Sequence, residues 1–391
     1  MSPSPPPIQI YAELLTNLRA LSLLITLSTP SNRSTTATLS TNPSSLTITH
    51  DHHTSSIRLP SGLPGSSSTK LALPTTPQKS LSYRLQLQDQ TRLDSNDEGN
   101  AVPWDSNALT GTTLHCSACE NLLVHELQWR DLPSEQWAEM MDLWHCHKPP
   151  DGDGDGSAER RAYAAGQRFT VAEGVGFVSL GYVLVNGGDC SGAIQKSTSV
   201  SDNLPMNVQC AKCEHVVGVE DRSTDALKLS KWSLKVTKGA KTKGYATVKW
   251  FSAQLLSAID AEGTRRFLIQ EDIRKADGTG KAALLWVFTN DLAYSSSFDQ
   301  EKRQDPTRAM KVFWKSIDEP EKVLKENQLN VEHVLLPANI YSRILGTLLS
   351  SRAVLPTASQ TYQDWQVGLL ERFTSLDCAI SEPERQTLVM R

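Results

Sequence analysis

The sequence His-Cys-Ser-Ala-Cys-Glu occupies residues 115–120, and a close variant, Gln-Cys-Ala-Lys-Cys-Glu, occupies residues 209–214. Both contain a CxxC pair, in which the two intervening residues form a turn that directs both sulfurs toward one point. Apolar residues follow each pair closely, as expected where such a turn is the tip of a β-hairpin. Two turns together supply the four thiolates of a tetrahedral Zn²⁺ site. We therefore predict one structural zinc ion bound by Cys116, Cys119, Cys210 and Cys213.

The two pairs lie far apart in the sequence, because residues 120–209 separate them. A compact zinc ribbon has a much shorter spacer, so the predicted ion must join two distant hairpins. Two other interpretations remain open: the cysteines could be unmetallated thiols, or redox pairs of the thioredoxin type. A redox pair would stand between a strand and the helix of a βαβ unit, and neither pair has that context.

The composition predicts a globular protein of two or three domains, because a chain of 391 residues with 39% hydrophobic residues can bury a sizeable core. The formal net charge of -4 provides no overall basic field, so any contact with nucleic acid or an anionic membrane would have to be local. The most apolar early stretch, Leu14 to Leu27, is interrupted by Asn17 and Arg19 and is too short to span a bilayer. We expect no direct nucleic acid binding and no membrane association.

Cysteine usage and the start of the chain favour the cytoplasm and nucleus. Four of the seven cysteines stand in CxxC pairs, which bind metal rather than form disulfides in a reducing compartment. The first seven residues carry no basic group of the kind that begins a secretory signal.

The pattern of apolar residues predicts a β-rich α+β fold. We divide it into an N-terminal β-rich lobe (1–110), a zinc-stapled β-hairpin middle region (111–225) and a C-terminal α+β region (226–391) with a tail after about residue 371. Strands are predicted at 45–49, 57–59, 81–87, 177–185, 227–237, 245–251 and 283–289, the pair 227–237 and 245–251 being joined by a hairpin loop at 238–244. Apolar residues at helical spacing predict a helix from Ile340 to Leu349.

The middle region contains a second cluster of metal-ligating side chains. A helix is predicted from about Ser134 to Trp144, with one apolar face, and the loop His145-Cys146-His147 follows it. The loop could replace one CxxC ligand, bind a second ion, meet a partner protein, or simply be a polar helix end. The segment Asp151 to Gly156 begins like a calcium-binding EF-hand loop, but Ala162 stands where that loop needs a bidentate Glu, so we interpret it as an acidic, glycine-rich loop.

The familiar catalytic templates are absent from the sequence. There is no GxxxxGK[ST], GxSxG, HExxH or strand-linked GxGxxG motif. The lysine-rich segment 228–249, with its interleaved aromatic residues, has a composition found in nucleic-acid surfaces. Strand alternation would instead place the lysines in solvent, where they protect a sheet edge.

Three features occur in a distinctive order: the two CxxC pairs, the segment from Pro133 to His147 between them, and Trp365-Gln-Val-Gly-Leu-Leu370 near the end. In this order the sequence resembles the HECT-like E2-binding ubiquitin ligase family, whose fungal relatives are linked to mRNA 3′-end processing. The similarity spans roughly Ile8 to Leu370. The resemblance implies an E3-like protein that binds a ubiquitin-conjugating enzyme (E2). It also implies binding to the endonuclease subunit of the mRNA cleavage and polyadenylation factor.

A HECT-type mechanism needs an accessible thiolate that accepts ubiquitin from the E2 as a thioester. No cysteine occurs between Leu335 and Leu370, where the HECT-like region ends. The remaining choices are Cys146, Cys190 and Cys378, of which we prefer Cys146 because a neighbouring imidazolium favours the thiolate. Cys378 is less suitable, because the negative charge of the preceding Asp377 disfavours its thiolate.

We accordingly predict a protein that acts chiefly through protein binding, with a partner site formed by Trp144, His145, Cys146 and His147. Whether it is an enzyme stays open. The alternative to an E3-like ligase is a non-catalytic or chaperone-like regulator of the endonuclease in pre-mRNA 3′-end processing.

Overall fold

A computed structural model describes residues 6–41, 44–62, 68–87, 100–132, 170–196, 206–222, 224–272, 280–298, 305–326 and 330–378. The predicted helix after Ser134, the His145-Cys146-His147 loop and the acidic loop at 151–156 lie outside these described residues. The chain forms two compact units, unit 1 (1–101 and 255–374) and unit 2 (102–254 and 375–391). The predicted three-region division at residues 110 and 225 remains a prediction. Within the described residues, no helix is long and apolar enough to cross a membrane.

The main sheet of unit 1 has nine strands in the described part, ordered β23-β24-β21-β20-β1-β2-β7, with β19 pairing β20 and β22 pairing β19. All of its pairs are antiparallel except β19 with β22. The strands are β1 (Ile8–Leu15), β2 (Ala20–Leu27), β7 (Ser80–Gln86), β19 (Arg266–Glu271), β20 (Ala282–Ser296), β21 (Thr307–Ile317), β22 (Glu332–Leu336), β23 (Thr361–Tyr362) and β24 (Trp365–Glu371). The predicted strand at 283–289 is therefore confirmed as a central one.

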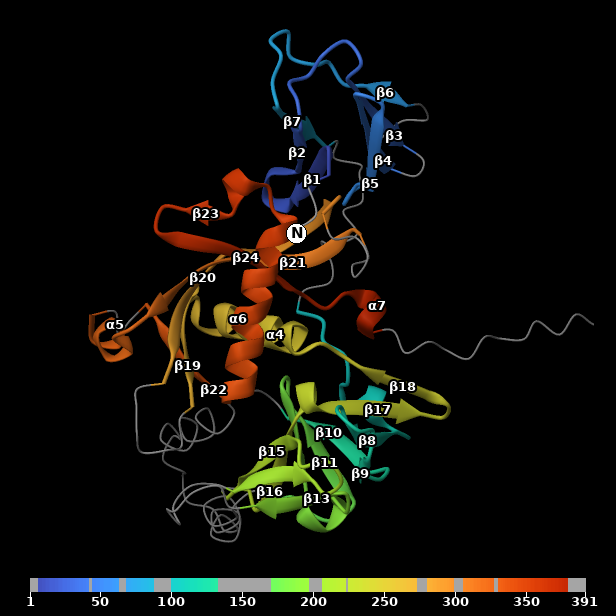
Figure 1. The fold of residues 1–391 in the computed structure, drawn as a ribbon. Helices are drawn as coiled ribbons and strands as arrows, with labels where there is room; N and C mark the ends of the chain where they lie inside the picture. The colour runs from blue at the N-terminus through green and yellow to red at the C-terminus, as the bar shows by residue number, and fades with distance from the viewer. Residues whose placement is uncertain are drawn as a thin grey trace, which may run out of the picture. The chain divides into compact units, whose positions relative to one another are not determined.

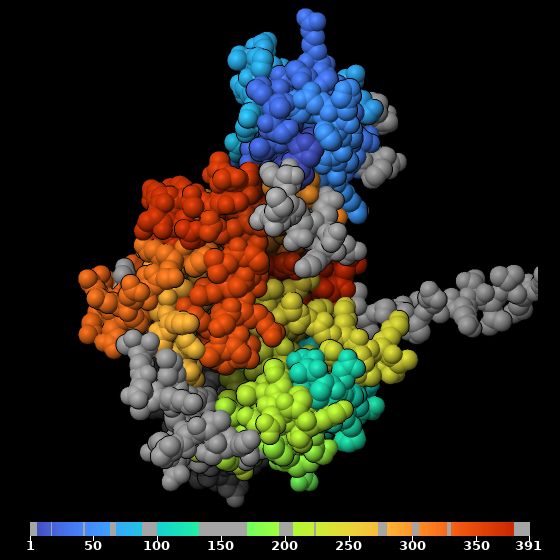
Figure 2. Space-filling view, in the orientation of Figure 1, coloured from blue at the N-terminus to red at the C-terminus, as the bar shows by residue number. Residues whose placement is uncertain are grey.

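A smaller sheet of four strands packs against the β1–β2–β7 end of the main sheet. Its strands are β3 (Thr36–Thr41), β4 (Ser44–His50), β5 (His53–Arg58) and β6 (Thr69–Lys70). The turn between β4 and β5 is tight because Asp51 and His52 both adopt positive φ angles, which short polar side chains tolerate. Both sheets contribute alternate apolar residues to one core, and their N-terminal strands lie in the blue part of the surface in Figure 2.

Two helices of unit 1 are α5 (Pro320–Glu326) and α6 (Ala338–Ser351), and the second confirms the helix predicted at 340–349. Ile340, Ile344 and Leu348 line one buried face of α6, which lies against the main sheet (Figure 1). Gly368 of β24 permits this close packing, because a Cβ there would come within 2.9 Å of the Leu348 carbonyl oxygen. The helix thus covers one face of the sheet.

Unit 2 contains a seven-stranded sheet, ordered β10-β11-β12-β16-β15-β14-β13, and a four-stranded sheet, ordered β18-β17-β8-β9, in its described residues. The elements are α1 (Ser106–Leu109), β8 (Thr113–Cys116), β9 (Leu122–Val124), β10 (Gln128–Asp131), β11 (Val175–Val178), β12 (Tyr182–Val185), β13 (Ala193–Lys196), β14 (Asn207–Cys210), β15 (Val216–Asp221), β16 (Ala226–Ser230), β17 (Leu234–Lys238), β18 (Lys241–Gly244) and α7 (Ser375–Cys378). The helix α4 (Thr247–Glu262) contains the boundary between the two units. The fold is β-rich, as predicted.

The strand predicted at 245–251 is wrong, because residues 247–262 form α4. The alternation of apolar and polar residues there favoured a strand, but Trp250 and Phe251 are buried on a helix, where Trp250 packs against Trp104. The hairpin instead turns between β17 and β18, within the predicted loop. Local pattern was overridden by tertiary packing.

Two other segments predicted as single strands are each split. Residues 177–185 form parts of β11 and β12, and residues 227–237 form parts of β16 and β17. Between β16 and β17 lies Lys231, which is only 1% exposed, so the prediction that the lysines of this segment face solvent is wrong at this position. Its ammonium donates to the Trp104 carbonyl oxygen at 2.9 Å and lies 5.3 Å from the centre of the Trp250 ring. These contacts compensate for its removal from water.

Candidate four-cysteine metal site

Two hairpin tips in unit 2 carry the four predicted cysteines. Cys116 ends β8 and Cys119 lies in the turn before β9, while Cys210 ends β14 and Cys213 lies in the turn before β15. The two strands that end at a cysteine belong to different sheets. The cysteine pairs therefore reach the same place from separate parts of unit 2.

The two turns have the same backbone structure. In each turn, the N–H of the Glu after the second cysteine donates to the carbonyl oxygen of the first cysteine. The Glu120 N–H donates to Cys116 and the Glu214 N–H donates to Cys210, both at 2.9 Å. Glu120 and Glu214 adopt positive φ angles of 59° and 57°. This left-handed residue closes a tight turn, so the sequence likeness of the two segments reflects one repeated local structure.

The four sulfur atoms all lie within 4.8 Å of one another. Cys116 Sγ is 3.7 Å from Cys213 Sγ, and Cys119 Sγ is 3.6 Å from Cys210 Sγ. A tetrahedron with Zn–S bonds of about 2.3 Å has sulfur atoms about 3.8 Å apart, whereas a disulfide requires about 2.05 Å. The spacing therefore fits four thiolates around one ion, and the donor set fits zinc.

Burial and hydrogen bonding act on these thiols in opposite directions. Burial raises the pKa of Cys116 to about 12. Burial also disfavours the Cys210 thiolate, but hydrogen bonds from the N–H groups of Cys213 and Lys212 and from the Cys119 and Cys213 thiols outweigh it and lower the pKa of Cys210 to about 7. A bound cation would stabilise all four thiolates together, so ion binding would release protons.

Gly192 connects the two cysteine turns. Its carbonyl accepts hydrogen bonds from the Asn121 side chain at 3.2 Å and from the Ala211 N–H at 2.9 Å. A Cβ at this position would collide with the carbonyl oxygen of Leu122. The glycine is therefore required for the close approach of the hairpins, a role that its sequence context gave no means to predict.

The remaining described cysteines occupy different environments. Cys190 is 3% exposed, and burial, reinforced by the charge of Asp189, raises its pKa to about 12, so it is a poor nucleophile. Cys378 is partly exposed at the end of α7, beside Asp377, whose carboxylate pairs with Lys249 at 2.9 Å. The structure does not describe the predicted partner residues Trp144, His145, Cys146 and His147.

The structure thus defines a β-rich protein in which two hairpin tips bring four cysteines together, an arrangement compatible with a metal ion. Residues 13–367 match the family described as HECT-like ubiquitin-conjugating enzyme (E2)-binding. The chain belongs to this family. The match includes all four cysteines of the site.

Three relatives are similar over most of their own lengths. An E3 ubiquitin-protein ligase of Bos taurus is 22% identical over 85% of this chain and 90% of its own. An uncharacterized protein of Saccharomyces cerevisiae is 23% identical over 68% of this chain and 69% of its own. An uncharacterized protein of Schizosaccharomyces pombe is 22% identical over 70% of this chain and 78% of its own. No solved structure matches this chain.

Proposed function

We propose that this protein is an E2-binding, E3 ubiquitin-ligase-like protein with a structural zinc ion. The observation that carries this proposal is the family match across residues 13–367, together with the similarity to a bovine E3 ubiquitin-protein ligase over 85% of the chain. The protein would act in the cytoplasm and nucleus.

The zinc ion would stabilise the fold rather than take part in chemistry. Four cysteine ligands fill a tetrahedral site, so no open position remains for a substrate or an activated water molecule. The two hairpin tips come from separate sheets, and an ion shared between them would hold those sheets together. Metal binding would then contribute directly to the free energy of folding.

If the protein transfers ubiquitin itself, a thiolate must attack the E2-ubiquitin thioester and release the E2 thiolate. The four clustered cysteines are assigned to the metal, and the buried Cys190 thiol is poorly suited to attack. Cys146 is our preferred nucleophile, and Cys378 is the other choice. Without a thioester on this chain, the protein would bind the charged E2 and act on it non-covalently.

A second candidate function is non-catalytic binding of the endonuclease subunit of the mRNA cleavage and polyadenylation factor. One observation favours it: the cluster Cys116, Cys119, Cys210 and Cys213 completes a tetrahedral ligand set without the loop His145-Cys146-His147. The two imidazoles and the thiolate of that loop would then be available to a partner, with Trp144 beside them.

Incubation with a panel of ubiquitin-charged E2 enzymes tests the proposal. Capture of at least one E2 by the full chain is expected, and a band that disappears on reduction in a non-reducing gel would identify a thioester. Cys146→Ala and Cys378→Ala variants then assign the nucleophile. Failure to bind any E2 would reject the E2-binding function, whereas binding without a thioester would support non-covalent action.

A further inference from the structure

One face of the main sheet in unit 1 carries a cluster of aromatic side chains, here called the aromatic face. They come from four strands, β20, β21, β23 and β24, and they contact one another from ring to ring. The residues are Trp286, Phe288, Phe313, Tyr362 and Trp365. The strand register explains the cluster, because Trp286 pairs with Phe313 and Tyr362 pairs with Trp365 across neighbouring strands.

Three of these rings form a stack whose two end rings are about half exposed. Phe288 stacks on Phe313 with centroids 4.8 Å apart and planes at 15°, and Phe313 stacks on Tyr362 at 5.2 Å and 21°. The middle ring, Phe313, is only 5% exposed, whereas Phe288 is 50% exposed and Tyr362 is 48% exposed. Large aromatic side chains this exposed and this closely grouped usually mark a binding surface.

Cationic groups lie at both margins of the aromatic face. On one side, the Arg266 guanidinium lies 5.7 Å from the centre of the Trp286 ring. On the other, the Lys315 ammonium lies 4.6 Å from the centre of the Trp365 ring and pairs with the exposed Asp364 at 2.8 Å. The Lys315 charge is therefore balanced by a carboxylate.

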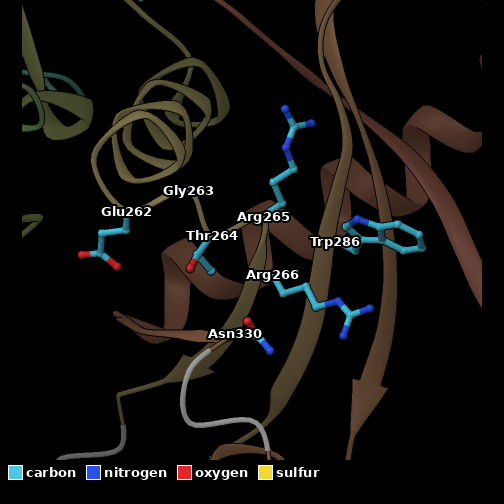
Figure 3. A pocket seen from close by; sticks show the side chains of 7 residues that line it. All are labelled: Glu262, Gly263, Thr264, Arg265, Arg266, Trp286 and Asn330. Carbon is cyan, nitrogen blue, oxygen red and sulfur yellow. The ribbon is translucent and has the colours of Figure 1, made fainter.

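The Arg266 margin opens into a pocket of about 490 Å³. The residues that line it are Glu262, Gly263, Thr264, Arg265, Arg266, Trp286 and Asn330. Figure 3 shows the two arginine side chains extending in different directions from consecutive positions, with Arg266 beside Trp286 and with Glu262 pointing away from both. Among the described residues, no carboxylate forms an ion pair with either arginine. The pocket therefore offers two guanidinium groups, each able to bind an anionic oxygen.

We propose that the aromatic face and this pocket bind single-stranded nucleic acid. Bases stack on the exposed rings of Phe288 and Tyr362, which extends the existing stack at both ends, and phosphate groups bind Arg265 and Arg266. Flat bases joined by anionic phosphates match a cluster of rings with cations at its margins, and an apolar peptide lacks the anions. A duplex is not a suitable ligand, because its bases are already stacked on one another.

The net charge of -4 excluded an overall basic field but not a local contact of this kind. The proposal nevertheless departs from the expectation of no direct nucleic acid binding, and binding of RNA would show that expectation to be wrong. The proposal does not rest on E2 binding, since it is argued only from the rings and cations of unit 1.

Fluorescence anisotropy of a fluorescein-labelled, mixed-sequence RNA of about 12 nucleotides tests the proposal with the full chain. Phe288→Ala and Tyr362→Ala should each weaken binding at least about fivefold, as the loss of one stacked base predicts. The double change Arg265→Ala with Arg266→Ala should reduce the slope of log Kd against log salt by about 1.4, or about 0.7 for each phosphate contact.

Matched controls lie elsewhere on unit 1. Leu349→Ala removes a side chain that is 52% exposed on α6, and Lys322→Ala removes an exposed cation on α5, so neither should change the affinity or the salt slope. Circular dichroism and thermal unfolding confirm that each variant is folded. The proposal is overturned if the wild-type chain does not bind the RNA, if the duplex binds equally well, if a poly-glutamate peptide competes as strongly as unlabelled RNA, or if the folded ring variants bind normally.

Discussion

Cys119 Sγ lies 3.6 Å from Cys210 Sγ, although 91 positions separate the two residues in the chain. The contact brings together a turn after β8 and a turn after β14, which belong to different sheets of unit 2. Each turn uses the same backbone hydrogen bond and the same left-handed glutamate. Two copies of one local structure thus form a single cluster of four sulfur atoms.

Gly192→Ala should destabilise unit 2 and lower its zinc content. The added Cβ would collide with the Leu122 carbonyl and push apart the two hairpins that Gly192 joins, at a cost of about 1–3 kcal/mol as in other overpacked sites. Gly187→Ala is the control, because a Cβ there has no neighbour within 4 Å. Urea unfolding with metal analysis measures both effects. Equal stability of the two variants would show that the hairpins do not depend on this close approach.

Lys231→Ala should destabilise the protein by about 2–4 kcal/mol. The change leaves the Trp104 carbonyl without its donor and opens a cavity beside Trp250. Lys235→Ala serves as the comparison, because that lysine pairs with an exposed carboxylate, Glu120, and should cost less than about 1 kcal/mol. Similar free energies of unfolding for the two variants would contradict the importance of the buried ammonium.

Asp51 should make the stability of unit 1 depend on pH in the acid range. Hydrogen bonds from Asn32 and Thr29 lower its pKa from 3.8 to about 2. Because the folded state favours the carboxylate, its contribution is present above pH 3.8 and is lost as the pH falls from about 4 through 2. Asp51→Asn should remove this dependence. NMR titration of the Asp51 carboxyl measures the pKa directly, and a midpoint near 4 would contradict the prediction.

Cys146→Ala and His147→Ala should leave zinc content and thermal stability near those of wild type while weakening capture of the endonuclease subunit. The reason is that Cys116, Cys119, Cys210 and Cys213 place four sulfur atoms close enough to fill a tetrahedral site without a further ligand. Metal analysis, thermal unfolding and pull-down with the purified subunit distinguish the outcomes. Release of zinc or unfolding of either variant would place the loop in the metal core instead.

The sequence predicted those features in which a short segment determines its own structure. A CxxC pair forms its turn locally, and the spacing of Ile340, Ile344 and Leu348 predicts the apolar face of α6. The sequence also predicted that the two cysteine pairs lie close together in the fold, because one zinc ion needs four ligands and each pair supplies two.

Features that depend on distant packing were missed or misread. Residues 245–251 alternate like a strand, but the packing of Trp250 against Trp104 and Tyr245 places them at the start of a helix. The aromatic face could not be predicted either. Its residues come from strands far apart in the sequence, and only the register of the folded sheet brings Phe313 between Phe288 and Tyr362.

The metal content of the purified full chain tests the central claim most directly. Elemental analysis of the folded wild-type protein should find one zinc ion per chain, while Cys119→Ser and Cys210→Ser should each lower both the zinc content and the free energy of unfolding. Cys190→Ser is the control, since that buried thiol lies outside the four-cysteine cluster and should leave the zinc content unchanged. A well-folded preparation that contains no zinc, and whose stability is unchanged by a chelator, would contradict the account.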